Sequence, residues 1–353
     1  SGTTFDGSGS YVSGSILEHC VVEYGGAYTT AVIENATYIN SCTFTNNSGG
    51  NSRDDGGVVQ AMLEVGEDTY KPVRIINSVF SQNSGNWAIK SAFDATITGN
   101  TLTNSGGINV RGGETSVTNN LVANASSIPW SAGIEADLGG HPIEPTVVIS
   151  DNLVRDNSRH GIYAFASDND TILVTISNNV IVRNDVGVGI GYDSQGYKET
   201  TINVTGNYIS DNSGGGVHIY DPKPEVNVRH NRIHNNNATN GSAIYIWDGL
   251  STWSHAALDT YEYNTVTGGT GTSLVFKSRG DTVIRYNNFA LSDEIFLVYD
   301  NYSPGVNTVF DFENNWWGTT DTTNLDALIY DWNDNPTKEQ VDYTPFLTAP
   351  NTT

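Results

Sequence analysis

Apolar and polar residues alternate with a period of two along most of the chain, in short runs that end at Gly, Asn, Asp or Ser. Alternation of this kind is typical of β-strands, and the residues at its ends are typical of turns. Helical periodicity is almost absent before about residue 322, where we expect one short helix over roughly Thr323 to Tyr330. The pattern therefore predicts an all-β protein built from many short strands.

One phrase recurs along the chain, with an apolar alternating strand on either side of an Asn. The recurring position is occupied by Asn100, Asn120, Asn152, Asn179, Asn207, Asn231, Asn264, Asn287 and Asn314, and in earlier copies by Cys20, Cys42 and Ser78. A second strand phrase begins with a small residue, usually Gly, as in GGINVR, HGIYAF and GGVHIY. Self-similarity at intervals of 20 to 36 residues predicts a repeat architecture.

Three short strands per repeat describe one coil of a right-handed parallel β-helix, in which each coil pairs with its neighbours. We expect about twelve coils over residues 15–317. The recurrent Asn should stack into an internal ladder, and its tolerance of left-handed backbone should ease the bend. A C-terminal cap is expected over residues 318–353, where Tyr343, Phe346 and Leu347 could cover the last coil. The sequence thus predicts one β-helix domain over residues 1–353.

Cys20 and Cys42 fall on adjacent rungs of this ladder. Two inert interior thiols are the preferred interpretation, and a disulfide is the alternative, because directly stacked strand positions give an imperfect geometry for the bond.

The Gly-led strand should send alternate side chains outward. Aligning its copies predicts one outward column of Glu64, Lys90, Arg111, Asp137, Phe165, Tyr220, Trp247 and Lys277, and a parallel column of Met62, Ala88, Asn109, Glu135, Tyr163, His218 and Tyr245. Asp221 and Asp248 follow directly after their strands. Long insertions at residues 48–57, 138–145, 193–200 and 249–259 fall beside this face and would wall a groove. A groove of aromatic and charged side chains suits a linear glycan.

Two reactions fit such a groove. Hydrolysis needs two carboxyl groups, for which Glu135 with Asp137 is one candidate pair and Asp221 with Asp248 another. Elimination from a uronic acid needs a cation and a base, and Lys90, Arg111 and Tyr163 could supply them. His218 is a further catalytic candidate, and Glu64, Asn109, Tyr220, Tyr245, Trp247 and Lys277 are candidates for substrate binding. The same charges could also form a surface ion-pair ladder, and the same rings could be ordinary strand residues.

Charge narrows the choice of partner. The net charge is −23, with 16 Lys and Arg against 39 Asp and Glu, and such a field repels nucleic acid and anionic lipid. It also argues against a polyanionic substrate unless salt screens the repulsion. We expect a monomer that does not insert into membranes and acts outside the cell or at its surface. No cofactor is firmly predicted, although the acidic clusters at residues 168–170 and 331–334 could hold calcium.

The phrases ISDNLVRDNSRHGIYAF and VTGNYISDNSGGGVHIY resemble the right-handed β-helix repeat of pectate-lyase-like proteins, over about residues 15–317. Locally, IKSAFDATITGNTLTNSGGINVRGG resembles a segment of alginate lyases and chondroitinase B. That resemblance implies Lys90 as base and Arg111 as acid or charge stabiliser, although the usual calcium ligands before the Lys are missing here and Gly112 stands where the family commonly has His. We expect a polysaccharide lyase or glycoside hydrolase; the alternative is a non-catalytic glycan-binding, adhesin or structural module of a larger surface protein.

Overall fold

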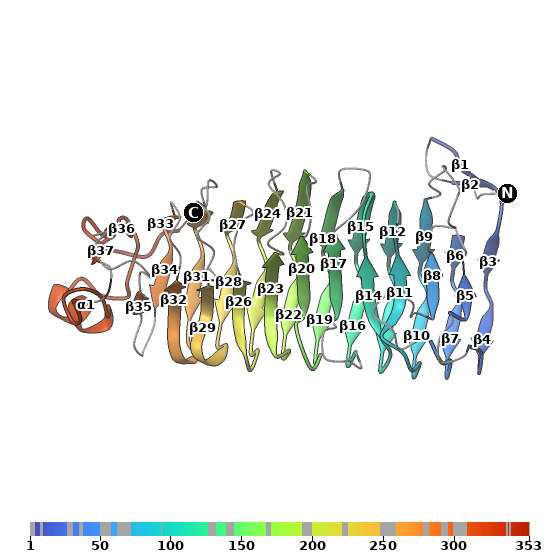
Figure 1. Cartoon of the computed structure of the whole chain (residues 1–353), viewed down its shortest axis with the longest axis horizontal. Helices are drawn as coiled ribbons and strands as arrows, with labels where there is room; N and C mark the ends of the chain where they lie inside the picture. The colour runs from blue at the N-terminus through green and yellow to red at the C-terminus, as the bar shows by residue number, and fades with distance from the viewer. Residues whose placement is uncertain are drawn as a thin grey trace. The chain divides into compact units, whose positions relative to one another are not determined.

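A computed structural model defines the fold in two compact units, residues 1–175 with 195–198 and residues 176–194 with 199–353. The structure describes residues 4–7, 10–26, 31–34, 38–49, 58–61, 72–92, 94–125, 132–138, 145–166, 171–192, 200–220, 225–247, 259–277, 282–290, 296–298, 309–336, 338 and 340–352. Each unit is built from short parallel strands that wind into coils, and we call them unit 1 and unit 2 (Figure 1).

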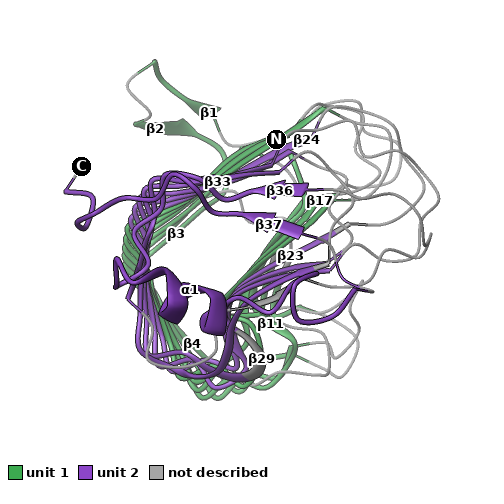
Figure 2. Ribbon diagram, turned by 90° about the vertical axis from the view of Figure 1, so that its left-hand side faces the viewer, with its two compact units in different colours: residues 1–175, 195–198 green, residues 176–194, 199–353 purple. Residues whose placement is uncertain are grey.

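In unit 1 the strands form three parallel sheets, one on each wall of the coil (Figure 2). The first sheet contains β3 (Ile16–Glu18), β6 (Tyr38–Asn40), β9 (Val73–Ile76), β12 (Ala95–Thr98), β15 (Glu114–Thr118) and β18 (Thr146–Ser150). The second contains β4 (Val21–Glu23), β7 (Thr43–Thr45), β10 (Val79–Ser81), β13 (Thr101–Thr103), β16 (Leu121–Ala123) and β19 (Leu153–Arg155). The third contains β5 (Ile33–Glu34), β8 (Val59–Ala61), β11 (Trp87–Ser91), β14 (Gly107–Val110), β17 (Ile134–Leu138) and β20 (Ile162–Ala166).

Unit 2 has the same three sheets. Strand β21 (Ile172–Ser177) is divided between the units, because unit 1 includes it up to Thr175 and unit 2 from Ile176. Its first sheet holds β24 (Thr200–Thr205), β27 (Glu225–Arg229), β30 (Asp259–Glu262) and β33 (Thr282–Arg285). Its second holds β22 (Val180–Val182), β25 (Tyr208–Ser210), β28 (Arg232–His234), β31 (Thr265–Thr267) and β34 (Asn288–Ala290). Its third holds β23 (Val186–Tyr192), β26 (Gly215–Tyr220), β29 (Asn237–Trp247), β32 (Thr270–Lys277) and β35 (Phe296–Val298). The predicted all-β parallel β-helix is therefore confirmed.

The predicted Asn ladder lies at the bend between the first and second sheets. In unit 2 each ladder amide donates from Nδ2 to the Oδ1 of the next at 3.0 Å, through Asn179, Asn207, Asn231, Asn264, Asn287 and Asn315. Asn100, Asn120 and Asn152 do the same in unit 1. The expected last member, Asn314, was wrong by one residue. The expectation for the bend was also wrong, because the left-handed backbone belongs to the residue before each rung, as at Asn314 with a φ of 59°.

A second ladder, which the sequence reasoning missed, lies at the bend between the second and third sheets. Asn184, Asn212 and Asn236 form it in unit 2, with Nδ2 to Oδ1 distances of 3.1 and 2.8 Å. Asn47 and Asn83 form it in unit 1 at 3.0 Å. Each of these residues follows a first-ladder position by five, and that fixed spacing was the available signal. Where both ladders are present, as around β25, a three-residue strand of the second sheet lies between two hydrogen-bonded bends.

Aliphatic and aromatic columns fill the interior of each unit. Side chains at the same coil position stack on one another, because parallel register places equivalent residues one rung apart. Ile75, Ile97, Val117 and Ile149 form one such column in unit 1, all with no exposed surface. The rings of Phe44 and Phe80 stack with centroids 4.8 Å apart and an interplanar angle of 4°. Such columns make each coil a tightly packed layer.

The C-terminal segment of unit 2 contains the one α-helix among the described residues, α1 (Thr322–Leu328), slightly shorter at its end than predicted. Asp321 caps its N-terminus by accepting from Thr323 N. Strand β36 (Val309–Asp311) pairs with β37 (Gln340–Asp342). The buried apolar residues here are Phe310, Phe312, Trp317, Leu325, Ile329 and Val341, whereas the expected Tyr343, Phe346 and Leu347 remain partly exposed. At the other end of the sequence, β1 (Thr4–Phe5) and β2 (Tyr11–Ser13) form an antiparallel hairpin in unit 1.

Cys20 and Cys42 are free thiols on successive coils, as preferred from the sequence. Cys42 is buried and its Sγ donates to the carbonyl of Leu17 at 3.3 Å. Burial raises the pKa of the Cys42 thiol, which keeps it in the unreactive protonated form.

Candidate functional site

The third sheet of unit 1 carries a continuous outward column of polar side chains. Strand pairing places Lys90 beside Asn109, Asn109 beside Glu135, and Glu135 beside Tyr163. The predicted alignment of Lys90 with Arg111 was therefore wrong, because Arg111 lies two positions further along the coil and follows β14. The Gly-led phrase misled the alignment, since β11 carries one extra residue between Trp87 and Ile89 relative to β14.

Three members of this column are buried although they point away from the apolar interior. Lys90 has no exposed surface, and Asn109 and Glu135 each expose 1%. Asn109 Nδ2 donates to Glu135 Oε1 at 3.2 Å. In the part of the chain that the structure describes, Asn109 Oδ1 accepts no hydrogen bond. We call Lys90, Asn109 and Glu135 the buried polar column.

The next outward position along the same strands holds an ion pair. Arg111 Nη2 lies 3.1 Å from Asp137 Oδ2, and the two side chains expose 19% and 13% of their surface. Asp137 and Glu135 are alternate residues of β17, so both carboxyl groups leave the same side of one strand. The structure thus brings together Glu135, Asp137, Asn109 and Arg111, all of which the sequence had singled out.

Aromatic rings flank the carboxyl groups on β20. Tyr163 pairs in register with Glu135, and Phe165 pairs with Asp137. The Tyr163 ring lies 6.3 Å from the Phe165 ring and 4.7 Å from the imidazole of His160, measured between centroids. His160 was not among the predicted site residues, so its contact with Tyr163 is an addition to the site.

The third sheet of unit 2 carries an aromatic cluster instead of a charged one. His218 and Tyr220 from β26 pair in register with Tyr245 and Trp247 from β29. His218 Nδ1 and Tyr220 Oη lie 3.0 Å apart, and the imidazole lies 5.2 Å from the Tyr245 ring. Burial, followed by the neighbouring Tyr245, raises the pKa of Tyr220 to about 12. Trp247 exposes 45% of its surface, so this cluster offers one open aromatic face.

Several predicted features fall outside the described residues. These are Glu64, Asp221, Asp248, the acidic cluster at residues 168–170, and most of the insertions expected to wall a groove. Lys277 pairs with Trp247 through its backbone in β32, and nothing is described of its side chain.

The other acidic cluster, at residues 331–334, forms a hydrogen-bonded turn. Asp331 exposes 2%, and its two carboxylate oxygens accept from Asn333 N at 2.8 Å and from Val341 N at 2.9 Å. The carboxylate thereby joins the turn to β37. Among the described residues, no group of three or more His, Cys, Asp or Glu side chains is arranged to hold a metal ion.

The geometry of unit 1 is suited to acid and base chemistry on a polar ligand. The Cα atoms of Glu135 and Asp137 are about 6.6 Å apart by strand rise, and both carboxyl groups leave the same strand face, so they could act on one ligand. Asn109 presents a buried acceptor that would bind a ligand hydroxyl. Arg111 adds donors beside Asp137.

The chain matches the model of one protein family and is similar to a solved structure. A crystal structure of DFA-IIIase from Arthrobacter chlorophenolicus A6 in complex with DFA-III is similar with a TM-score of 0.39 and 13% identity, over 96% of this chain and 83% of that one. A search of curated proteins finds no match. Among the described residues, no helix is long and apolar enough to span a bilayer. The family described as "Right handed beta helix region" matches residues 60–201 and 174–258, which together exceed half of the chain. The chain belongs to this right-handed β-helix family.

Proposed function

We propose that this protein is a glycoside hydrolase that cleaves a neutral polysaccharide on the outer face of the third sheet of unit 1. The buried polar column of Lys90, Asn109 and Glu135 is the observation that supports the proposal. Buried ionisable groups on an outward strand face are typical of functional sites, and this column places Glu135 one outward position from Asp137.

The proposed reaction divides the work between Glu135 and Asp137. Glu135, the more buried carboxyl, donates a proton to the glycosidic oxygen as the bond to the anomeric carbon breaks. Asp137 takes a proton from the water whose oxygen attacks that carbon, so that atoms and charge balance. Arg111 positions Asp137 through the 3.1 Å ion pair, and Asn109 positions Glu135 through the 3.2 Å hydrogen bond.

Elimination from a uronic acid is less well supported. Its cation must neutralise the substrate carboxylate, whereas the guanidinium of Arg111 already faces Asp137. Lys90 and Arg111 are also not neighbours in register, so the spacing of the resembling lyase segment is not reproduced. The net charge of −23 further disfavours a polyanionic chain.

The aromatic cluster of unit 2 supports a sugar ligand independently. Exposed Trp247 offers a face for the apolar side of a sugar ring, and His218 with Tyr220 offers hydrogen-bonding groups beside it. We propose that this cluster binds glycan without cleaving it, and that the protein acts outside the cell or at its surface, where polysaccharides occur.

The test is a panel of neutral and uronate-containing polysaccharides, with new reducing ends and near-ultraviolet absorbance measured in parallel. Hydrolysis predicts reducing ends from a neutral polymer without the absorbance of an unsaturated sugar. Glu135→Gln and Asp137→Asn, which keep the shape of each side chain, should each lower kcat by at least about a hundredfold, the usual contribution of a general acid or base.

Glu114→Gln is the matched control, because Glu114 is an exposed carboxylate of β15 in the same unit. It should cleave at the wild-type rate, and thermal unfolding should show all variants folded. If unsaturated sugars appear, elimination replaces hydrolysis; if no glycan is cut but one is retained, the protein is a binding module.

A further inference from the structure

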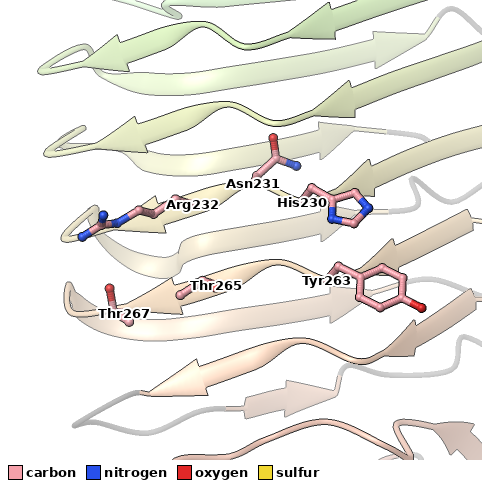
Figure 3. Close-up of a pocket in the computed structure, with 6 residues that line it drawn as sticks. All are labelled: His230, Asn231, Arg232, Tyr263, Thr265 and Thr267. Atoms are coloured by element: carbon pink, nitrogen blue, oxygen red, sulfur yellow. The ribbon is translucent and has the colours of Figure 1, made fainter. Parts of the chain in front are cut away.

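A shallow depression lies on the second sheet of unit 2, on a different wall of the coil from the aromatic cluster (Figure 3). It is lined by His230, Asn231, Arg232, Tyr263, Thr265 and Thr267 from two successive coils. None of these residues was predicted as a site residue from the sequence, and Asn231 was assigned only to the ladder. The missed signal was the aromatic character of the residue before the ladder Asn in three successive coils.

One side of the depression is a stack of rings at the bend. The imidazole of His230 lies parallel to the Tyr263 ring, with centroids 5.0 Å apart and an angle of 5°, and Tyr263 stacks on Tyr286 at 5.4 Å and 15°. Each ring belongs to a left-handed residue that precedes a ladder Asn. The ladder fixes the backbone beneath the rings, so their polar edges project from a rigid base (Figure 3).

The opposite side is formed by Arg232 and two threonines. Arg232 is exposed, and its Cζ lies 5.5 Å from the Tyr208 ring centroid, which steadies the guanidinium. Thr265 is its partner in register on β31. Thr267 Oγ1 is held by His234 Nδ1 at 2.8 Å. Hydroxyl groups thus lie along β31, with the guanidinium beside them on β28 (Figure 3).

Arg232 is the charged side chain among the described residues that line the depression, and none of these residues carries a carboxylate. The acidic neighbour at the bend, Glu262, exposes 7% and is held by Arg229 at 3.4 Å and Arg285 at 2.7 Å. Two cations therefore compensate one carboxylate, and Arg232 adds a further positive charge. Arg232, the charged side chain that lines the depression, therefore offers a position for an anion in a chain whose net charge is −23.

We propose that this depression binds a carboxylate-bearing sugar residue. The carboxylate pairs with the Arg232 guanidinium, the ring hydroxyls bond Thr265 and Thr267, and the far edge of the sugar contacts His230 and Tyr263. This site lies apart from the buried polar column and anchors a glycan without cleaving it.

The experiment is titration calorimetry of the full chain with uronate oligosaccharides, with neutral oligosaccharides of the same length, and with acetate. The proposal predicts that uronate oligosaccharides bind, that Arg232→Gln weakens them by at least about tenfold, and that Thr265→Val has a smaller effect in the same direction. Arg183→Gln is the matched control, because Arg183 is an exposed arginine of unit 2 outside the depression, and it should bind like the wild type.

Equal affinity for neutral and acidic oligosaccharides, no binding of the acidic ones, or unchanged binding by Arg232→Gln would each overturn the proposal. Acetate binding as tight as that of the oligosaccharide would also overturn the proposal, because the sugar ring would then contribute nothing to the affinity. The assay distinguishes this site from the proposed hydrolase, since Glu135→Gln should leave uronate binding unchanged whether or not the enzyme proposal holds.

Discussion

At the scale of single residues, the outer face of the third sheets differs from a solvated β-surface. A solvated face would expose its charges, whereas Lys90 and Glu135 are buried in unit 1 and His218 exposes 7% in unit 2. Burying a polar group costs free energy unless it is hydrogen-bonded. Among these buried groups Asn109 donates to Glu135, and His218 lies within hydrogen-bond distance of Tyr220. This burial is the reason for proposing that a polar ligand binds on this face.

Tyr220 should make the stability of the folded state depend on pH. Its pKa is raised from 10.0 to about 12, chiefly by burial, so the folded state favours the neutral phenol. The stabilisation that Tyr220 contributes is present below pH 10 and is lost as the pH rises through about 12. Tyr220→Phe should accordingly lose less stability than the wild type between these pH values.

The measurement is denaturant unfolding of both proteins across the alkaline range, together with phenolate absorbance. The wild-type minus Tyr220→Phe difference should show one phenol ionising near pH 12. A difference spectrum that titrates near pH 10 would show that burial does not protect the hydroxyl.

At the scale of elements, side-chain hydrogen bonds at the bends hold the short strands in place. A three-residue strand such as β25 has little stability alone, but it lies between Asn207 of one ladder and Asn212 of the other. Asn207 donates from Nδ2 to the carbonyl of Ile176 and accepts from the backbone and side chain of Asn179. Its loss would leave several buried groups without partners.

Asn207→Ala should therefore lower the free energy of unfolding by about 3 kcal/mol, from buried groups that cost about 1 to 3 kcal/mol each. Asn203→Ala is the matched control, because Asn203 is a half-buried outward residue of β24 in the same coil, and surface substitutions usually change stability by less than about 0.5 kcal/mol. Denaturant unfolding of both variants measures the difference. Equal losses would mean that the ladder contributes no more than an ordinary strand position.

The fold could be predicted because the same sequence phrase recurs in many coils. Each copy of the Asn phrase repeats the same bend, so errors at single copies, such as Asn314 for Asn315, do not change the architecture. The site is harder to predict, because the register changes within β11: Trp87 pairs with Gly107 but Lys90 pairs with Asn109, two positions before Arg111. The alternation of apolar and polar residues also does not show which outward polar side chains are buried. The sequence thus predicted which residues belong to the site better than it predicted which of them lie side by side.

At the scale of the whole molecule, the charge of −23 sets which substrates can approach. Long-range repulsion slows a polyanion and leaves a neutral chain unaffected, and salt removes that repulsion. A single exposed cation such as Arg232 attracts an anion only over a short distance and does not cancel the long-range repulsion. The charge therefore favours a neutral polymer at the catalytic face.

This has a kinetic consequence. Between about 0.01 M and about 1 M salt, over which the screening length falls from about 30 Å to about 3 Å, kcat/KM for the cleaved glycan should change by less than about twofold. Initial rates at several salt concentrations measure it. A steep rise with salt would instead identify a polyanionic substrate.

The most direct test of the account is a crystal structure of Glu135→Gln with an oligosaccharide of the glycan that the wild type cleaves. The side chain of residue 135 should lie within hydrogen-bond reach of a glycosidic oxygen, with Asp137 facing the anomeric carbon across one water molecule. A sugar chain bound on another wall of the coil, or with its glycosidic oxygens beyond reach of both residues, would contradict the assignment of the buried polar column as the place of cleavage.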